Sequence, residues 1–240
     1  MKILAVETST ESCSVAVWAD GAEHLREAIA GQRHSELLIG MVDDALKESG
    51  LRVADMDGVA FGSGPGSFTG IRIACGVVQG LAFGAHKPVI AIPSLLALAE
   101  AAGACRVIAA FDARMGETYL AAYERDGVTW KSVIEPCLVD RHSLPPVDGK
   151  EWVGIGSGFE AHAYVREAYH AHISGVVSGR LPSAREVARL AVKAMAAGAA
   201  ISPELAVPLY IRNKVALTSA ERAAQRDLGA CLTYGKSAAK

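Results

Sequence analysis

The order of predicted elements indicates an α/β protein made of two lobes, each with the order βββαβαβα. Three observations support this fold class. The chain has 240 residues, of which 51% are hydrophobic, and this is enough for two small cores. Short β-prone runs alternate with stretches of helical periodicity through the first hundred residues. A similar order of elements begins again near residue 105, although no sequence repeat accompanies it.

The first lobe is expected over residues 1–103. Its strands are expected at 2–8, 13–19, 22–30, 57–62 and 88–92, and its helices at 35–50, 70–85 and 94–103. Asp20-Gly21 is a hairpin signal between the second and third strands. Ser35 is the expected N-cap of the first helix, and Gly50 fits the position just after its end.

The second lobe is expected over residues 104–212, and residues 213–240 form a polar C-terminal tail. Its strands are expected at 105–111, 117–124, 127–135, 151–156 and 173–177, and its helices at 159–170 and 183–198. Two lobes of this order form the duplicated ribonuclease-H-like fold of actin, sugar kinases and Hsp70 chaperones. Proteins of that fold bind ATP in the cleft between the lobes, but a shared fold alone does not assign a function.

Composition narrows the class of partner. The formal net charge is −2 and no run of basic residues is present, so strong autonomous nucleic-acid binding is not expected. The five cysteines are widely spaced and odd in number, which is typical of reduced thiols in a cytosol. The N-terminus lacks a leader-like segment and no apolar run is long enough to span a membrane, so we expect a cytoplasmic protein.

Two polar turns are candidates for phosphate contact. The loop FGSGPGSFTGIR at 61–72 joins a strand to a helix, where free backbone N–H groups and the positive helix end favour anions. It matches neither the Walker A motif nor G-x-G-x-x-G, so a plain tight turn remains an alternative. The turn ETSTES fits two interpretations, a second phosphate-contacting turn and a polar hairpin tip. The candidate residues are Thr8, Ser9, Thr10, Gly64, Gly66 and Ser67.

Two helices of the first lobe carry unusual faces. The apolar face of helix 35–49 is wider than packing on one sheet requires. Helix 70–85 carries Gly76, Gly80 and Gly84 at four-residue spacing, and each glycine costs about 1 kcal/mol relative to alanine. This stripe predicts the close approach of another backbone. Both helices could equally cover only their own sheet and each other.

Several motifs together resemble the bacterial TsaB family, also called YeaZ. They are MKILAVETSTESCSVAV, RHSELL, GSGPGSFTGIRIA, FDARMGETYLAAY and PLYIR, spread over residues 1–212. The resemblance implies a non-catalytic subunit required for threonylcarbamoylation of the tRNA adenosine next to the anticodon. It implies that the chain binds and activates the metal-containing paralogue TsaD together with the ATPase TsaE, and that tRNA is bound through the complex. It also implies no intrinsic cofactor, ATP or ADP at the complex interface, and a homodimer when the chain is alone.

The resemblance further places the partner interface on the two unusual helices. The expected contact residues are Leu38, Met41, Val42, Ala45, Ala74, Val77, Val78 and Leu81. The catalytic paralogue is expected to carry an H-x-x-x-H metal-binding pair where this chain has Ser94, Leu95 and Leu98. We therefore expect no metal site and no catalytic residue here.

Two departures and two alternatives qualify this interpretation. Glu7 replaces the usual Asp of the first turn, and Ala74 stands where a glycine is common. Asp112 and Arg114 are expected to form an ion pair at the start of the second lobe, with Glu117 as a third member. An autonomous ATP-dependent kinase or ATPase of the same fold is the first alternative, and a metallopeptidase is the second.

Overall fold

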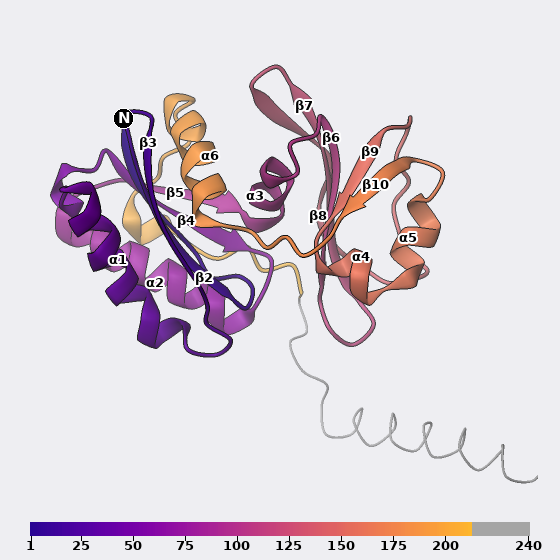
Figure 1. Cartoon of the computed structure of the whole chain (residues 1–240), viewed down its shortest axis with the longest axis horizontal. Coiled ribbons are helices and arrows are strands. Elements are labelled where there is room, and N and C mark those ends of the chain that lie inside the picture. Colours follow the sequence, from indigo (N-terminus) through magenta and orange to yellow (C-terminus); the bar gives the residue numbers. More distant parts are fainter. Residues whose placement is uncertain (213–240) are drawn as a thin grey trace, which may run out of the picture.

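The protein, described here by a computed structural model over residues 1–212, contains two five-stranded sheets side by side (Figure 1). The strand orders are β3-β2-β1-β4-β5 and β10-β9-β6-β7-β8. The predicted polar tail at 213–240 lies outside the described residues. The sheets and the helices that cover them form the duplicated ribonuclease-H-like fold that the sequence predicts.

The first sheet follows the predicted order of strands. Its members are β1 (Lys2–Glu7), β2 (Ser12–Ala19), β3 (Ala22–Ile29), β4 (Gly58–Gly64) and β5 (Val89–Pro93). β1, β2 and β3 form an antiparallel meander, whereas β4 pairs parallel with β1, and β5 pairs parallel with β4. The carboxyl ends of β1, β4 and β5 therefore meet at one edge of the sheet.

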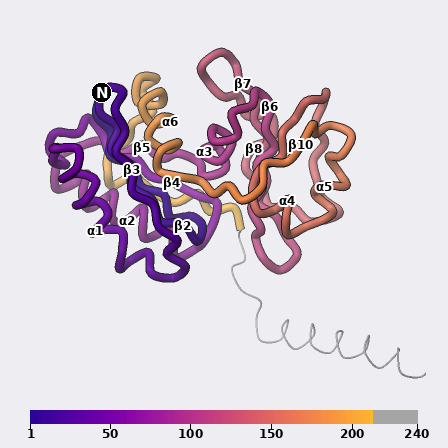
Figure 2. Tube along the Cα trace, viewed as in Figure 1, coloured from indigo at the N-terminus to yellow at the C-terminus, as the bar shows by residue number. Residues whose placement is uncertain are grey.

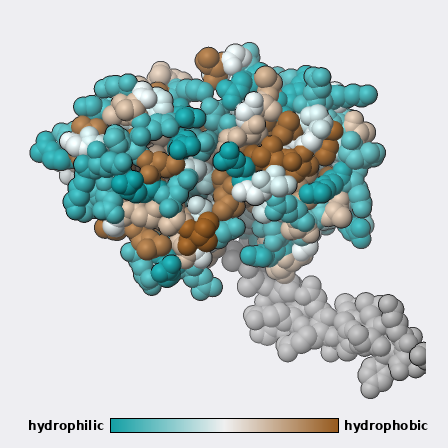
Figure 3. All heavy atoms as spheres, viewed as in Figure 1, coloured by the Kyte–Doolittle hydropathy of each residue, from teal (hydrophilic) through white to brown (hydrophobic). Residues whose placement is uncertain are grey.

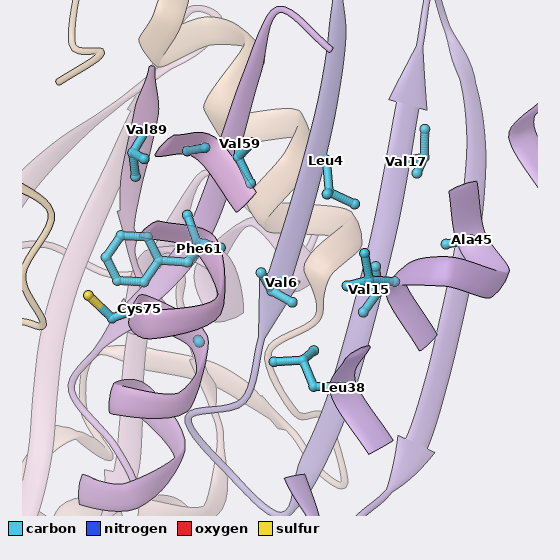
Figure 4. Close-up of a cluster of buried hydrophobic side chains, with 14 of the residues drawn as sticks. Leu4, Val6, Val15, Val17, Leu38, Ala45, Val59, Phe61, Cys75 and Val89 are labelled. Atoms are coloured by element: carbon cyan, nitrogen blue, oxygen red, sulfur yellow. The ribbon is translucent and has the colours of Figure 1, made fainter. Parts of the chain in front are cut away.

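Helices α1 (His34–Ser49) and α2 (Phe68–Ala85) cover one face of this sheet. Figure 4 shows the core that they close, with Leu38 and Ala45 of α1 and Cys75 of α2 facing strand residues such as Val15 and Phe61. α1 begins at His34 after Arg33 and has no side-chain cap, so the prediction of Ser35 as N-cap is wrong. Ser35 is exposed within the first turn, while His34 is buried and its Nε2 lies 3.2 Å from the Ser12 carbonyl oxygen.

The second sheet has the same central order but a different covering. Its strands are β6 (Arg106–Asp112), β7 (Thr118–Asp126), β8 (Thr129–Val139), β9 (Trp152–Ile155) and β10 (Ile173–Val177). No helix separates β8 from β9, and this is a departure from the full βββαβαβα order. The connection contains Pro145-Pro146, and proline is incompatible with a helix interior. The expected helix at 159–170 is divided into α4 (Ser157–Ala161) and α5 (Ala163–Tyr169), because His162 is extended.

Two helices lie between the sheets, and each packs against the sheet of the other lobe. α3 (Ser94–Ala101) packs Leu95 and Leu98 into the core of the second sheet. α6 (Ala184–Ala196), which follows the second sheet in sequence, packs on β1, β2 and β4 of the first sheet. The tube in Figure 2 shows this return of the orange segment towards the first lobe. In sequence, all strands of the first sheet precede residue 103 and all strands of the second sheet follow it. α6 also follows residue 103 but packs on the first sheet. The domain boundary therefore stays a prediction.

Residues 203–212, here called the strap, begin with the short 3-10 helix η2 (Pro203–Leu205) and return along α2. The Gln79 side chain donates to the carbonyl oxygens of Pro203 and Ala206 at 3.1 and 3.0 Å. Arg72 Nε donates to the Tyr210 hydroxyl at 2.8 Å. The strap therefore holds one side of α2 and continues towards the second lobe.

Within residues 1–212, α2 is the one helix that is long and apolar enough to cross a membrane by length and composition. The core helix of a folded domain can pass the same test. α2 packs against β4 and η2, and Ile71, Ala74, Val78 and Ala82 are buried there.

Candidate functional sites

A cleft of about 750 Å³ lies between the lobes. Three parts of the chain line it: the first turn with the glycine loop, the start of the second lobe, and the strap. The polar lining residues include Ser9, Thr10, Glu11, Ser67, Asp112, Arg114, Ser157, Glu160, Tyr210 and Arg212. This volume is large enough for a small-molecule ligand.

The glycine loop is packed tightly against the β1–β2 turn. A Cβ at Gly66 would lie 2.3 Å from the Ser9 carbonyl oxygen, and a Cβ at Gly70 would lie 2.0 Å from the Thr8 carbonyl oxygen. Ser67 N donates to that Ser9 oxygen at 2.7 Å, and Thr8 Oγ1 donates to the Gly70 oxygen at 2.8 Å. Close contact between two backbones therefore accounts for glycine at both positions.

Ser67 is the N-cap of α2. Its hydroxyl accepts a hydrogen bond from Gly70 N at 3.2 Å, and this satisfies one of the free N–H groups of the first turn. The sequence identified the loop and placed the start of the helix about two residues too late. The cap thus joins the loop to the first turn of the helix at the wall of the cleft.

Behind the turn, the Glu7 carboxyl group is fully buried. Its Oε1 accepts from Ser9 N at 2.5 Å, and its Oε2 accepts from the Ser94 hydroxyl at 2.8 Å. Ser94 Oγ in turn accepts from Gly64 N at 3.2 Å. Burial raises the pKa of Glu7, although the hydrogen bonds from Ser9 and Ser94 oppose this shift.

The opposite wall of the cleft is a second polar cluster. The Arg114 guanidinium lies 3.3 Å from Asp112 Oδ2, which confirms the ion pair predicted at the start of the second lobe. His162 Nε2 lies 3.0 Å from Asp112 Oδ1, and Asp112 N donates to the Ser157 hydroxyl at 3.1 Å. Glu117 does not join this pair, and it pairs instead with Arg212 of the strap.

The structure brings together four of the six residues predicted near a phosphate. Ser9, Thr10, Gly66 and Ser67 line the cleft. Thr8 and Gly64 are buried behind them. Phosphate contact by this group stays a prediction, since the tight backbone packing explains the glycines without a ligand.

Five of the eight residues expected at the partner interface lie in the core. They are Leu38, Val42, Ala45, Ala74 and Val78, each at most 4% exposed. Met41, Val77 and Leu81 are partly buried against the same core. Helical periodicity identified the apolar stripes correctly, and their five buried members face the sheet and are not accessible to a partner. Partner contact by the three partly buried residues stays a prediction.

The outer side of the helix pair has a different composition, and we call it the α1–α2 face. It comprises Ile39 and Gly40 of α1 and Gly76, Gly80, Phe83 and Gly84 of α2, all of them exposed. Ile39 is 54% exposed and Phe83 is 63% exposed. No other part of residues 1–212 lies within 4 Å of a Cβ built at Gly76, Gly80 or Gly84, so the close approach that the glycine stripe predicts is not made within these residues. In Figure 3, apolar atoms reach the surface over the lower part of the first lobe, where Figure 1 places α2.

The position expected for a metal-binding pair is occupied by packing residues. Leu95 and Leu98 are fully buried in the core of the second sheet, and Ser94 is committed to Glu7. Among residues 1–212, no group of three or more His, Cys, Asp and Glu side chains could hold a metal ion. Sequence reasoning missed the link between Ser94 and Glu7, for which the only signal was a serine that follows Pro93 at the helix start.

Comparison with known proteins places this geometry in one class. The family model described as "TsaD: tRNA N6-adenosine threonylcarbamoyltransferase" matches residues 27–219. The YeaZ structure from Pseudomonas aeruginosa superposes with a TM-score of 0.79 at 36% identity, and the match covers 87% of this chain and 99% of that one. The fold and the two lobes are thus those of the threonylcarbamoyltransferase group of ribonuclease-H-like proteins.

Full-length relatives define the particular branch. The chain is 40% identical over 230 residues to the Escherichia coli protein named tRNA threonylcarbamoyladenosine biosynthesis protein TsaB, with 90% of this chain and 96% of that protein covered. The Haemophilus influenzae protein of the same name is 36% identical, with 90% and 95% covered. The chain belongs to the TsaB (YeaZ) family.

Proposed function

We propose that this chain is the non-catalytic subunit of a cytoplasmic complex that attaches threonylcarbamoyl to the tRNA adenosine next to the anticodon. The chain would bind and activate a TsaD-like paralogue that carries the metal, together with a TsaE-like ATPase. Family membership supports a role in tRNA threonylcarbamoyladenosine biosynthesis. Transfer chemistry is assigned to the paralogue because buried leucines occupy the position expected for a metal-binding pair.

The observation that carries the proposal is the α1–α2 face. Helix-interior glycines at Gly40, Gly76 and Gly80 each cost about 1 kcal/mol relative to alanine, and open space surrounds them in the isolated chain. Glycine allows two helix backbones to approach closely, so a helix pair from a partner would recover this cost. Two helices from each subunit would form a four-helix seam. A second copy of this chain could occupy the same face when the paralogue is absent.

The seam would have a defined size and chemistry. A stable interface buries about 1,600 Å² in total, and its centre is usually depleted of charge. The glycines and the exposed Ile39 and Phe83 would supply such a centre. Exposed Asp44 of α1, and Asp43 with its ion-pair partner Lys47, would supply a polar rim. Binding of ATP or ADP near the assembled surface and contact of the complex with tRNA belong to the same proposal.

Reconstitution with each subunit omitted in turn tests this function. We expect no threonylcarbamoyl-tRNA from this chain alone and full transfer when the TsaD-like and TsaE-like proteins and the donor are added. Formation of the modified nucleoside would be measured by mass spectrometry of digested tRNA. Transfer by the isolated chain, or undiminished transfer by the mixture that lacks it, would refute the proposal.

The cleft between the lobes supports an alternative function, that of an autonomous ATPase. Its volume and the placement of Ser9, Thr10 and Ser67 on its wall would admit a nucleotide. Turnover of ATP by the purified chain, measured without partners, separates this alternative from the proposed role.

A further inference from the structure

The buried carboxyl group of Glu7 occupies a position where open α/β sheets usually bind a ligand. Such ligands lie outside the carboxyl ends of parallel strands. Glu7 ends β1, Gly64 ends β4, and Ser94 directly follows the end of β5. These three residues form one hydrogen-bonded chain, with Gly64 N donating to Ser94 Oγ and Ser94 Oγ donating to Glu7 Oε2.

The surrounding backbone is shaped around this carboxyl group. A Cβ at Gly62 would lie 1.8 Å from Glu7 Oε2, so any side chain on that residue would collide with it. Ser9 N and the Ser94 hydroxyl both point their protons at the carboxyl oxygens. Without Glu7, both donors would be buried and unsatisfied, which is unfavourable for any buried polar group.

The bond to Ser9 reaches the first turn of α2 in two steps. Glu7 Oε1 fixes the Ser9 backbone, and the Ser9 carbonyl oxygen then accepts from Ser67 N, the N-cap residue of α2. Thr8, between Glu7 and Ser9, donates to the Gly70 oxygen inside the same turn of the helix. The position of the helix start therefore depends on the carboxyl group through short, buried contacts.

We propose that Glu7 is a positioning residue whose carboxyl group acts as a built-in ligand at the ends of β1, β4 and β5. It holds the first turn of α2 in place and thereby orients the α1–α2 face. The effect on the first turn is a property of this chain alone. Its consequence for partner affinity rests on the proposed function.

Replacement of the carboxyl group and its chemical restoration test this inference. In Glu7→Ala, we expect amide hydrogen exchange at Ser9 and over residues 67–71 to become at least tenfold faster, while exchange in α5 is unchanged. Acetate supplies two acceptor oxygens to the same donors, so tens of millimolar acetate should restore slow exchange. Acetamide has nearly the same shape but only one acceptor oxygen, and it should restore much less.

Two further variants keep the test decisive. Glu11→Ala removes an exposed carboxyl group from the same turn and should exchange like the wild type. Glu7→Gln keeps the side-chain volume, and it should still speed exchange at the start of α2 or of α3, because one acceptor is lost. Equal restoration by acetamide and acetate, or wild-type exchange in Glu7→Gln, would overturn the proposal.

Partner affinity is measured separately. Calorimetry with the TsaD-like protein should show about tenfold weaker binding by Glu7→Ala and recovery in acetate, although no residue of the α1–α2 face is altered. If the wild-type chain binds no such partner, the proposed function fails while the exchange result still decides the role of Glu7. If exchange responds but affinity does not, the link from Glu7 to the face is wrong.

Discussion

Glu7 shows how one buried side chain determines the identity of its neighbours. Gly62 must lack a side chain because the carboxyl group lies against it, and Ser94 must carry a hydroxyl because it is the donor to Oε2. The three residues come from two strands and a helix far apart in the sequence. Their arrangement is therefore visible only after folding, even though each residue is unremarkable on its own.

The titration of Glu7 gives a prediction on stability. Burial raises its pKa above 4.5, the ordinary value of a glutamate, so the folded state binds its proton more tightly than the unfolded chain does. Its contribution to the free energy of unfolding is fully present below pH 4.5 and is lost as the pH rises through the raised pKa. In Glu7→Gln this loss should disappear. Urea unfolding from pH 4 to 8 measures the free energy of unfolding of both proteins. As the pH rises, the value for Glu7→Gln should increase relative to that of the wild type.

The same experiment has a clear control. Glu11→Gln removes an exposed carboxyl group and leaves Glu7 in place, so its curve of stability against pH should run parallel to that of the wild type. A Glu7→Gln curve that also runs parallel to the wild type would show that Glu7 titrates alike in the folded and unfolded states.

At the scale of elements, hydrophobic periodicity and turn-forming residues predicted most of the fold. The Asp20-Gly21 hairpin, the strand and helix order of the first lobe and the left-handed Gly50 after α1 all appear in the structure. These features depend on residues close in sequence, and local preferences determine them. The helix cap at Ser35 was mispredicted because the burial of His34 and its bond to Ser12, 22 residues away, determine where α1 starts.

The candidate sites were less predictable for the same physical reason. Periodicity identifies an apolar stripe, but it does not say whether the sheet or a partner covers it. Leu38 and Val78 proved to be core residues, whereas Gly76 and Gly80, which have no side chain and so add nothing to an apolar stripe, are exposed on the α1–α2 face. The strap could not be foreseen either, because residues 203–212 have neither helical nor strand periodicity and are held by side chains of α2.

Gly80 offers the direct test of the α1–α2 face. Gly80→Lys puts a long charged side chain where the isolated chain has open space, so the monomer should stay folded and gain slightly in helix propensity. A close helix seam would have to desolvate that charge, and affinity for the TsaD-like protein should fall at least tenfold. Isothermal titration calorimetry measures the affinity, and circular dichroism checks the fold.

The matched control is Gly175→Lys, which places the same charge at an exposed glycine of β10 that also has open space around it. We expect wild-type affinity from this variant. Val78→Lys is unsuitable as a test because Val78 is fully buried, and a buried lysine would unfold the helix pair itself. Unchanged affinity in Gly80→Lys would exclude α2 from the contact.

At the scale of the whole molecule, the lobes are joined by α3, α6 and a half-buried charge cluster. The Glu100 carboxylate of α3 accepts from Arg125 of β7 at 2.8 Å, Trp130 of β8 at 2.6 Å and Lys193 of α6 at 3.5 Å. Burial alone would raise the pKa of Glu100, but the contacts with Trp130, Lys193 and Arg125 outweigh burial and lower it. One side chain thus connects the second sheet to both helices between the lobes.

Removal of this carboxylate should weaken the whole molecule and not one lobe alone. Glu100→Ala leaves Arg125, Trp130 and Lys193 without their shared acceptor, and hydrogen bonds to charged groups contribute about 2 kcal/mol each. We expect the free energy of unfolding to fall by at least about 2 kcal/mol. The unfolding transitions followed by tryptophan fluorescence and by far-ultraviolet circular dichroism should separate, because the lobes lose the hydrogen bonds of Glu100 that connect them. Urea unfolding monitored by both signals measures this.

Glu124 of β7, the strand that also carries Arg125, provides the comparison. Its ion pair with Arg106 spans 2.7 Å but is 39% exposed on both sides, so Glu124→Ala should cost under about 1 kcal/mol and leave the two transitions coincident. The difference between the variants depends on the number of elements that the carboxylate joins, since Glu124 contacts one other element, β6, and Glu100 contacts three, β7, β8 and α6. Equal destabilisation in the two variants would mean that the contact between the lobes relies on apolar packing of α3 and α6 alone, with no specific contribution from Glu100.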